Sequence, residues 1–260
     1  MQISKRDLLT IFVLSIVFFS VATWNLGMEQ VPLTIWQTTS NETFYIDLDK
    51  VESIGSVYFL VKDGSATIQV YTGSLGNWSY SGSLNVTWPW SYYSWSKIAI
   101  NRNTRYVRFS FQQPSIEIAE MAVLSQDNQR IAINAVTSEI VSDPNLPKLV
   151  DEQSLVQCPP TYMSETYFDE IYYVRTAEEY PKLQWPYEWT HPPLGKIIIA
   201  AGITVFGYNP FGWRIMGVVF AVFMIALIYI LGKELFGTWI GAFASAFLFM
   251  FSFMNFTMGR

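Results

Sequence analysis

The chain has 260 residues, of which 51% are hydrophobic and only 14% charged, and this composition is too apolar for an ordinary soluble domain. The net charge of −5 and the lack of a basic stripe argue against a nucleic-acid partner. The single cysteine, Cys158, excludes an intrachain disulfide, so an extracytoplasmic domain would depend on its hydrophobic core.

Three uncharged apolar runs predict three membrane helices, because about 20 apolar residues cross the core of a bilayer. The runs cover residues 8–28, 215–232 and 235–259.

Lys5 and Arg6 precede the first run, which places the N-terminus in the cytoplasm. A signal peptide has the same basic start and apolar core. The length of the run and the lack of a good cleavage site after it favour a retained anchor. Residues 1–29 would then be the cytoplasmic N-terminus and the first membrane helix, and residues 214–260 the second and third membrane helices.

Residues 30–125 have the period-two pattern of β-strands. Phe44, Ile46 and Leu48 alternate with polar residues, and short alternating runs recur at 57–61, 68–70 and 107–111. This pattern predicts an antiparallel β sandwich with one buried face. Three glycosylation sequons, at Asn41, Asn77 and Asn85, are compatible with an extracytoplasmic position.

The same region resembles the discoidin-like jelly roll, through residues 44–48, 67–71, 105–109 and 116–120. The resemblance implies that loops at one end of the sandwich bind carbohydrate or lipid head groups. Candidate ligand contacts are the tryptophans of these loops, which are Trp78, Trp88, Trp90 and Trp95. Their faces could stack on sugar rings or settle at a membrane interface, and the alternative is that they fill the core of the sandwich.

Residues 126–213 are predicted to form a connector and an external loop with two helices. Thr166 and Asp169 have the spacing of a capping box for the first helix, which Pro181 ends. The second helix is predicted to start at Pro192-Pro193 and to stop at Gly207. Its apolar part is roughly 15 Å long, half a bilayer, so we expect it to lie along the membrane interface. Residues 30–213 would then be extracytoplasmic, and Lys233 would face the cytoplasm.

Four motifs in the second half of the chain resemble the protein O-mannosyltransferase family. They are Phe168-Asp169-Glu170, Thr190 to Lys196 (THPPLGK), Gly207 to Arg214 (GYNPFGWR) and the Met258-Gly259-Arg260 ending. The resemblance implies a polytopic α-helical membrane protein of GT-C type at the plasma membrane, with the β sandwich inserted into it. It also implies many more membrane helices, so we expect this chain to be an N-terminal part that is inactive by itself.

The family resemblance also implies roles for particular residues. Asp169 is the expected catalytic base, supported by Glu170, and Arg214 is the expected contact of the donor phosphate. Lys196 and Arg260 are further candidates for the phosphate, and His191 and Tyr173 for support. Tyr173 stands where some prokaryotic relatives carry a histidine, which puts a role for this side chain in question.

The chemistry of sugar transfer requires such residues independently of the family. A hydroxyl acceptor needs a base for its proton, and a leaving phosphate needs cations. The structural alternatives are a helix cap for Asp169, a buried helix-start residue for His191 and a lipid-facing cation for Lys196. A divalent cation is compatible with the reaction, but one histidine and one cysteine provide no clear metal-ligand set, so no metal site is predicted.

The sequence therefore predicts the N-terminal part of an inverting membrane glycosyltransferase. It would move a sugar, mannose in the first instance, from a polyprenyl-phosphate donor to a serine or threonine of an acceptor protein on the outer face of the membrane. The alternative is a membrane-anchored, non-catalytic carbohydrate-binding protein. The Asp169-Glu170 pair and the short helix after Pro193 favour the enzyme, because a lectin needs neither.

Overall fold

The computed structural model describes residues 3–139 and 143–258, which form two compact units. Gln30–Arg175 make up one, called here the β unit. Met1–Glu29 and Thr176–Arg260 make up the other, the helical unit.

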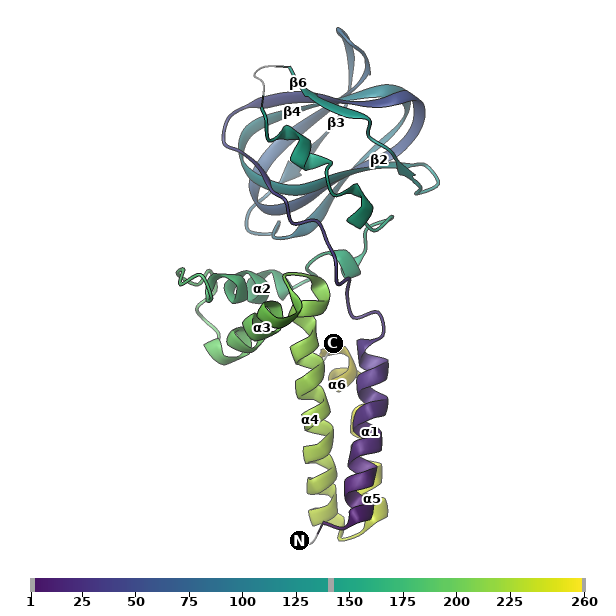
Figure 1. Ribbon diagram of the computed structural model, residues 1–260, viewed down its shortest axis with the longest axis vertical. Helices are drawn as coiled ribbons and strands as arrows, with labels where there is room; N and C mark the ends of the chain where they lie inside the picture. The colour runs from purple at the N-terminus through teal and green to yellow at the C-terminus, as the bar shows by residue number, and fades with distance from the viewer. Residues whose placement is uncertain (1–2, 140–142, 259–260) are drawn as a thin grey trace. The chain divides into compact units, whose positions relative to one another are not determined.

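The β unit is an antiparallel sheet built around two long, bent strands (Figure 1). Its strands are β1 (Trp36–Thr38), β2 (Glu42–Ser74), β3 (Asn77–Val86), β4 (Ser94–Ser125), β5 (Arg130–Ile131) and β6 (Ala135–Ser138). The main order is β1-β4-β2-β3, and β5 and β6 pair with β4 and β2. The middle of β2 pairs with two stretches of β4 at once, since Val57 faces both Ile98 and Val123. The predicted antiparallel β structure is confirmed.

The core of the β unit consists of the side chains that the period-two pattern placed inside. Phe44 and Ile46 are completely buried, and they face Phe109 and Val107 on β4. The ring of Phe44 lies 5.7 Å from that of Phe111 and 6.0 Å from that of Trp36. Edge-to-face and offset ring contacts of this kind add to the free energy gained by burying the aromatic area.

The β unit extends past residue 125, where the sequence placed its end. β5 and β6 follow that point, and two leucines of the 3₁₀ helix η1 (Leu146–Leu149) are buried against the core. These strands are too short to show a periodicity, and pairing with β4 and β2 stabilises them. Two more 3₁₀ turns follow, η2 (Gln153–Leu155) and η3 (Tyr162–Ser164), and then helix α2 (Glu170–Glu179), which continues into the helical unit.

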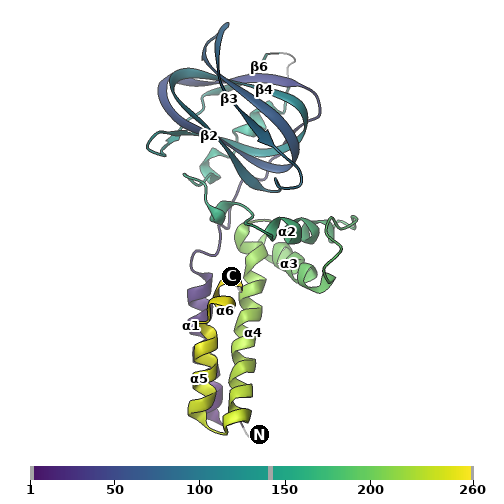
Figure 2. The ribbon, with the colours of Figure 1, turned by 180° about the vertical axis from the view of Figure 1, so that it is seen from behind.

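The helical unit contains α1 (Lys5–Thr23), α3 (Pro193–Phe206), α4 (Pro210–Phe236), α5 (Trp239–Met250) and α6 (Phe253–Met258). Figure 2 shows α1, α4 and α5 side by side. Helices α1 and α4 are antiparallel: at one end Lys233 of α4 lies 3.0 Å from the buried Asp7 carboxylate, and at the other Phe211 N–H donates to Met28 O. Asp7 also accepts a hydrogen bond from the Tyr229 hydroxyl at 2.8 Å.

Two of the described helices, α1 and α4, are long and apolar enough to cross a bilayer. The third predicted membrane helix is interrupted: α5 has 12 residues and ends at Met250, before the separate helix α6. Gly237 has a left-handed backbone (φ 64°) and Thr238 caps the start of α5, so the helix loses its first residues. At its other end Ser252 accepts a hydrogen bond from Asn255 N–H and starts α6. Hydropathy alone cannot reveal the late start of α5 or the break before α6, because no charged or strongly polar residue marks these positions.

Candidate functional site

The predicted catalytic carboxylates lie at the start of α2, on a segment fastened to the β unit. Thr166 donates its hydroxyl to Tyr92 O at 2.6 Å and its N–H to Tyr93 O at 3.0 Å. Thr166 is therefore buried against the β unit, three residues before Asp169.

The capping box predicted for Thr166 and Asp169 is wrong. Helix α2 begins at Glu170, one residue after Asp169, and the Glu170 carboxylate accepts a hydrogen bond from Tyr167 N–H at 2.8 Å. The Thr166 hydroxyl is instead used by the β unit. A carboxylate does accept a hydrogen bond from a backbone N–H at the start of the helix, but it belongs to Glu170 and not to Asp169.

Asp169 is exposed, and in the described part of the chain no hydrogen bond or ion pair engages its carboxylate. The preceding residue, Phe168, has a left-handed backbone with φ 50°, which is unfavourable for a bulky side chain. Such strain persists only where the surrounding structure imposes it, and it is common at functional sites. Asp169 is thus held at a tight turn with its carboxylate accessible.

Two contacts fix the first turns of α2 on the β unit. Arg175 forms an ion pair with Asp63 at 2.8 Å, and the ring of Tyr172 meets that of Trp90 edge-on at 6.4 Å. Tyr173 is half-buried on the same helix. Neither Arg175 nor Asp63 was among the predicted site residues, because nothing local in the sequence connects them.

The Thr190–Lys196 motif is organised by a residue that the sequence analysis missed, Glu188. The Lys196 side chain is almost fully buried (1% exposed), and its ammonium contacts the Glu188 carboxylate and donates to Glu188 O at 2.6 Å. Burial opposes ionisation of Glu188, but hydrogen bonds from Lys196 and Thr190 outweigh it and lower the pKa of this carboxyl. Lys196 therefore stabilises the start of α3 and does not extend to a lipid surface.

His191 precedes α3 with its side chain mostly exposed (59%), and its Nδ1 lies 3.2 Å from the Glu188 carboxylate. It is thus not the buried helix-start residue that was the structural alternative. Helix α3 itself starts at Pro193 and is followed by Gly207, with φ 91°, as predicted.

The Gly207–Arg214 motif forms the junction of α3 and α4. Asn209 caps α4 by accepting from Gly212 N–H at 2.7 Å, and its amide donates to Glu29 O at 2.9 Å. A side chain on Gly212 would meet Gly207 O at 2.2 Å, so the backbone needs glycine here. Arg214 is buried (7% exposed) and donates to Leu26 O at 3.0 Å. Asn209, Gly212 and Arg214 thus help to hold the helical unit together.

The predicted site residues fall in both units. Asp169, Glu170 and Tyr173 belong to the β unit, and His191, Lys196 and Arg214 to the helical unit. Arg260 lies outside the described residues. Within residues 3–139 and 143–258, no group of three His, Cys, Asp or Glu side chains could hold a metal ion.

The four candidate tryptophans of the β unit divide into two pairs. Trp95 packs edge-on against Tyr58 at 6.4 Å beside Val156, and Trp78 is half-buried against Tyr45. These two therefore have structural contacts. Trp88 and Trp90 are more exposed, at 51% and 66%, although the Arg175 guanidinium lies 6.0 Å from the centre of the Trp88 ring and Tyr172 meets the Trp90 ring edge-on.

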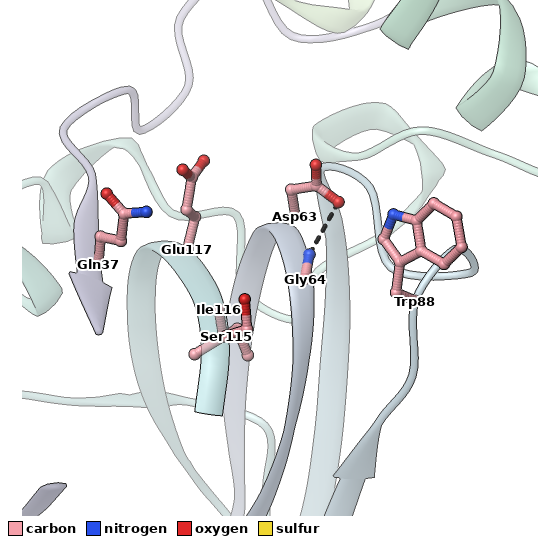
Figure 3. Close-up of a pocket in the computed structure, with 7 residues that line it drawn as sticks. All are labelled: Gln37, Asp63, Gly64, Trp88, Ser115, Ile116 and Glu117. Atoms are coloured by element: carbon pink, nitrogen blue, oxygen red, sulfur yellow. Dashed lines mark hydrogen bonds between the residues drawn. The ribbon is translucent and has the colours of Figure 1, made fainter. Parts of the chain in front are cut away.

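Trp88 lines a pocket of about 220 Å³ in the β unit (Figure 3). The other lining residues include Gln37 of β1, Asp63 and Gly64 of β2, and Ser115 and Glu117 of β4. Gly64 N–H donates to the Asp63 carboxylate at 2.8 Å. The sequence analysis named only Trp88 from this group, because the others come from three strands that meet only in the folded sheet.

Comparison with known proteins finds similarity for part of the helical unit. A family model described as dolichyl-phosphate-mannose-protein mannosyltransferase matches residues 190–260. The predicted resemblance to protein O-mannosyltransferases is thereby confirmed for this part of the chain.

Among curated proteins, the polyprenol-phosphate-mannose–protein mannosyltransferase of Mycobacterium tuberculosis is 42% identical over 59 residues. The protein of the same name in Corynebacterium glutamicum is 41% identical over 58 residues. Each match covers 22% of this chain and 11% of the relative's length.

Among solved structures, a pectin-binding carbohydrate-binding module aligns with 40% of this chain and 80% of its own, at 15% identity and a TM-score of 0.33. A module in complex with 4,5-unsaturated mannuronic acid aligns with 39% and 84%, at 12% identity and a TM-score of 0.30.

Proposed function

We propose that this chain is the N-terminal part of a protein mannosyltransferase that uses polyprenyl-phosphate mannose. The observation that carries the proposal is the match of residues 190–260 to that family, since it includes the motifs around Lys196 and Arg214. The accessible Asp169 carboxylate supports it, because this is the group that the chemistry requires.

In the proposed reaction, a serine or threonine hydroxyl of the acceptor protein attacks the anomeric carbon of the donor sugar. The bond from that carbon to the phosphate oxygen breaks, polyprenyl phosphate leaves, and the configuration at the carbon inverts. Asp169 accepts the hydroxyl proton, while the Glu170 carboxylate holds the turn through Tyr167 N–H. A guanidinium such as that of Arg214 matches the phosphate oxygens.

We further propose that α1 and α4 cross the plasma membrane, with the N-terminus in the cytoplasm. Their antiparallel packing supports this orientation, because it brings Lys233 to the same end as Lys5 and Arg6. Positive residues at one end of a helix pair favour the cytoplasmic side. Residues 30–213 are then extracytoplasmic, and α3, with 14 residues, lies along the interface.

The test is Asp169→Asn in the full-length enzyme. We expect turnover to fall by about 10²-fold or more, with binding of the donor lipid retained, because the base is lost and the phosphate contacts are not. The matched control is Asp127→Asn, another exposed aspartate of the β unit, which should be neutral. Full turnover in a folded Asp169→Asn enzyme would exclude Asp169 as the base, and Glu170 would be tested next.

A second candidate function is that of a membrane-anchored carbohydrate-binding protein without transferase activity. The partial exposure of Trp88 and Trp90 favours it. It predicts that the full-length protein moves no labelled mannose from polyprenyl phosphate to any acceptor peptide.

A further inference from the structure

We propose that the loop between α2 and α3, residues 180–192, inserts its two tryptophans into the head-group layer of the bilayer and anchors α3 there. The proposal rests on the membrane crossing proposed above for α1 and α4. It goes beyond the transferase reaction, because it assigns a lipid contact to the α2–α3 loop. The side chains that carry it all belong to the helical unit.

The α2–α3 loop presents large apolar side chains to its surroundings. Leu183, Trp185 and Trp189 are 94%, 95% and 79% exposed. Within the described residues, neither indole takes part in a hydrogen bond or a ring contact. A tryptophan combines a large apolar ring system with one N–H donor, and for this reason it gathers at the boundary between acyl chains and head groups. Both indoles of the loop are free to take that position.

The polar groups of the loop bond to the helices beside it. Glu188 N–H donates to the Thr176 hydroxyl at 3.0 Å, and the Glu188 carboxylate contacts the Lys196 ammonium. The Glu179 carboxylate accepts a hydrogen bond from Tyr187 N–H at 2.5 Å. Backbone and charged groups that already have partners cost less free energy to remove from water. The loop thus meets a requirement for entering the head-group layer.

The turn after α2 holds an apolar side chain outward at an energetic cost. Leu183 has a left-handed backbone (φ 54°), which is unfavourable for a residue other than glycine, and its N–H donates to Tyr180 O at 3.0 Å. Strain of this kind persists where the surrounding structure imposes it, and it is common at ligand contacts. Burial of the Leu183 side chain among lipids would offset the strain, because it removes apolar area from water.

The packing of α3 on α4 sets the depth of this region. Gly202 of α3 lies so close to α4 that a side chain there would meet Gly212 O at 2.5 Å and Met216 at 2.9 Å. Met216 follows Pro210, the first residue of α4, by six residues, so this contact is at most about 9 Å from the start of that helix. Amphipathic helices at a membrane surface bury their apolar face by about 5–10 Å. Helix α3 and the loop before it therefore belong at the head-group boundary.

The exposed side of α3, which follows the loop, is apolar as well. Figures 1 and 2 both show α3 running away from the axis of α4. Four exposed residues at spacings of three or four share one face of the helix, namely Leu194, Ile197, Ala201 and Val205. The only charged residue of α3, Lys196, is buried. A helix face in water would carry polar side chains, whereas this one suits lipid.

The charges of the loop favour a lipid contact that does not depend on anionic lipids. Residues 180–192 contain one lysine, Lys182, and one glutamate, Glu188, so their net charge is zero with His191 neutral. Lys182 also forms an ion pair with the Glu178 carboxylate at 2.7 Å. Strong attraction to anionic head groups requires a cluster of basic residues. We therefore expect insertion into a zwitterionic bilayer, driven by the apolar side chains.

The test uses a fluorescent label on the loop of the full-length protein in phosphatidylcholine nanodiscs. Gln184→Cys provides the thiol and keeps both tryptophans, with Cys158 and any other cysteine replaced by serine. Acyl-chain-brominated lipids quench a nitrobenzoxadiazole label that reaches them, and iodide quenches a label in water. Phe223→Cys, on the exposed side of α4, is the lipid control, and Asp127→Cys, at an exposed turn of the β unit, is the water control.

We expect lipid quenching at position 184 to be about threefold or more stronger than at position 127, and iodide quenching to be weaker. Quenching at 184 by iodide alone would overturn the proposal, because the loop would then lie in water. Quenching by neither agent would also overturn it, because another protein segment would then cover the loop. Lipid quenching of the Phe223→Cys label shows whether α4 lies in the bilayer, so a failure of the loop proposal is distinguishable from a failure of the proposed membrane crossing.

Substitution of the two tryptophans tests their role. Trp185→Ser/Trp189→Ser should reduce lipid quenching of the label at 184 by about threefold, because the interfacial anchors are lost. Tyr80→Ser, at an exposed aromatic position of the β unit, is the matched control and should leave it unchanged. Equal quenching with and without the tryptophans would refute their anchoring role.

Two further measurements complete the test. Addition of phosphatidylglycerol should leave quenching at 184 unchanged, and insertion only in its presence would contradict the argument from charge. If a labelled variant fails to fold, intrinsic fluorescence of the unlabelled protein decides. Trp185→Phe/Trp189→Phe should lower the fraction of tryptophan emission that brominated lipids quench, and an unchanged fraction would refute the proposal.

Discussion

The fully buried carboxyl group of Glu120 should make the stability of the β unit depend on pH. Burial raises the pKa of Glu120 from 4.5 to about 8, although Met121 N–H, Glu152 N–H and the Gln153 amide donate hydrogen bonds to it. The folded state therefore keeps this proton at pH values where the unfolded chain has released it. The contribution of Glu120 to stability is greatest below about pH 4.5 and falls by about 1.4 kcal/mol per pH unit from about pH 5 to pH 8, where the loss levels off.

The assay is urea unfolding of residues 30–175, expressed alone, at several pH values from 5 to 8. The only histidine of the chain, His191, lies outside this segment, so no other side chain with an ordinary pKa titrates in the same range. Glu120→Gln should remove the slope, at a cost of about 1 kcal/mol for one mismatched hydrogen bond. Asp127→Asn, at an exposed position, should leave the slope unchanged. Equal slopes in the wild type and in Glu120→Gln would refute the assignment.

Two further predictions concern contacts around the candidate site. Arg175→Ala breaks the ion pair with Asp63 that holds α2, so turnover of the full-length enzyme should fall by about tenfold, and adding Asp63→Asn should cause little further loss in a double-mutant cycle. Additive losses would show that the two residues act separately. Lys196→Ala leaves the Glu188 carboxylate without its cation and should lower the thermal midpoint of the helical unit by on the order of 5–10 °C, with partial recovery in Lys196→Ala/Glu188→Gln. A double variant no more stable than Lys196→Ala would argue against this ion pair.

Features set by neighbouring residues were predictable from the sequence. The alternation of Phe44 and Ile46 with polar residues predicted a half-buried strand, because successive side chains of a strand point to opposite faces. Pro193 and Gly207 marked both ends of α3, because each restricts or permits particular backbone angles locally. The motifs of residues 190–214 also pointed to the family whose model matches residues 190–260.

Some predictions failed although the residues were well chosen. Thr166 had the spacing of a helix cap, but Tyr92 O and Tyr93 O of the β unit compete for its hydroxyl. The third membrane helix looked continuous in hydropathy, but Thr238 and Ser252 each cap a helix and divide the run. In each case a hydrogen bond of one side chain decided the structure, and composition does not record which partner such a side chain takes.

By itself, the sequence determined the β and helical character of the parts of the chain, and the family that residues 190–260 resemble, since these depend on local periodicity and on short motifs. Only the tertiary structure decided that Glu188 neutralises Lys196, that Glu120 is buried, and that Glu117 faces Trp88 across a pocket. The physical reason is that ionisation and binding depend on which groups surround a side chain in space. In an antiparallel sheet, those neighbours come from strands that lie far apart in the chain.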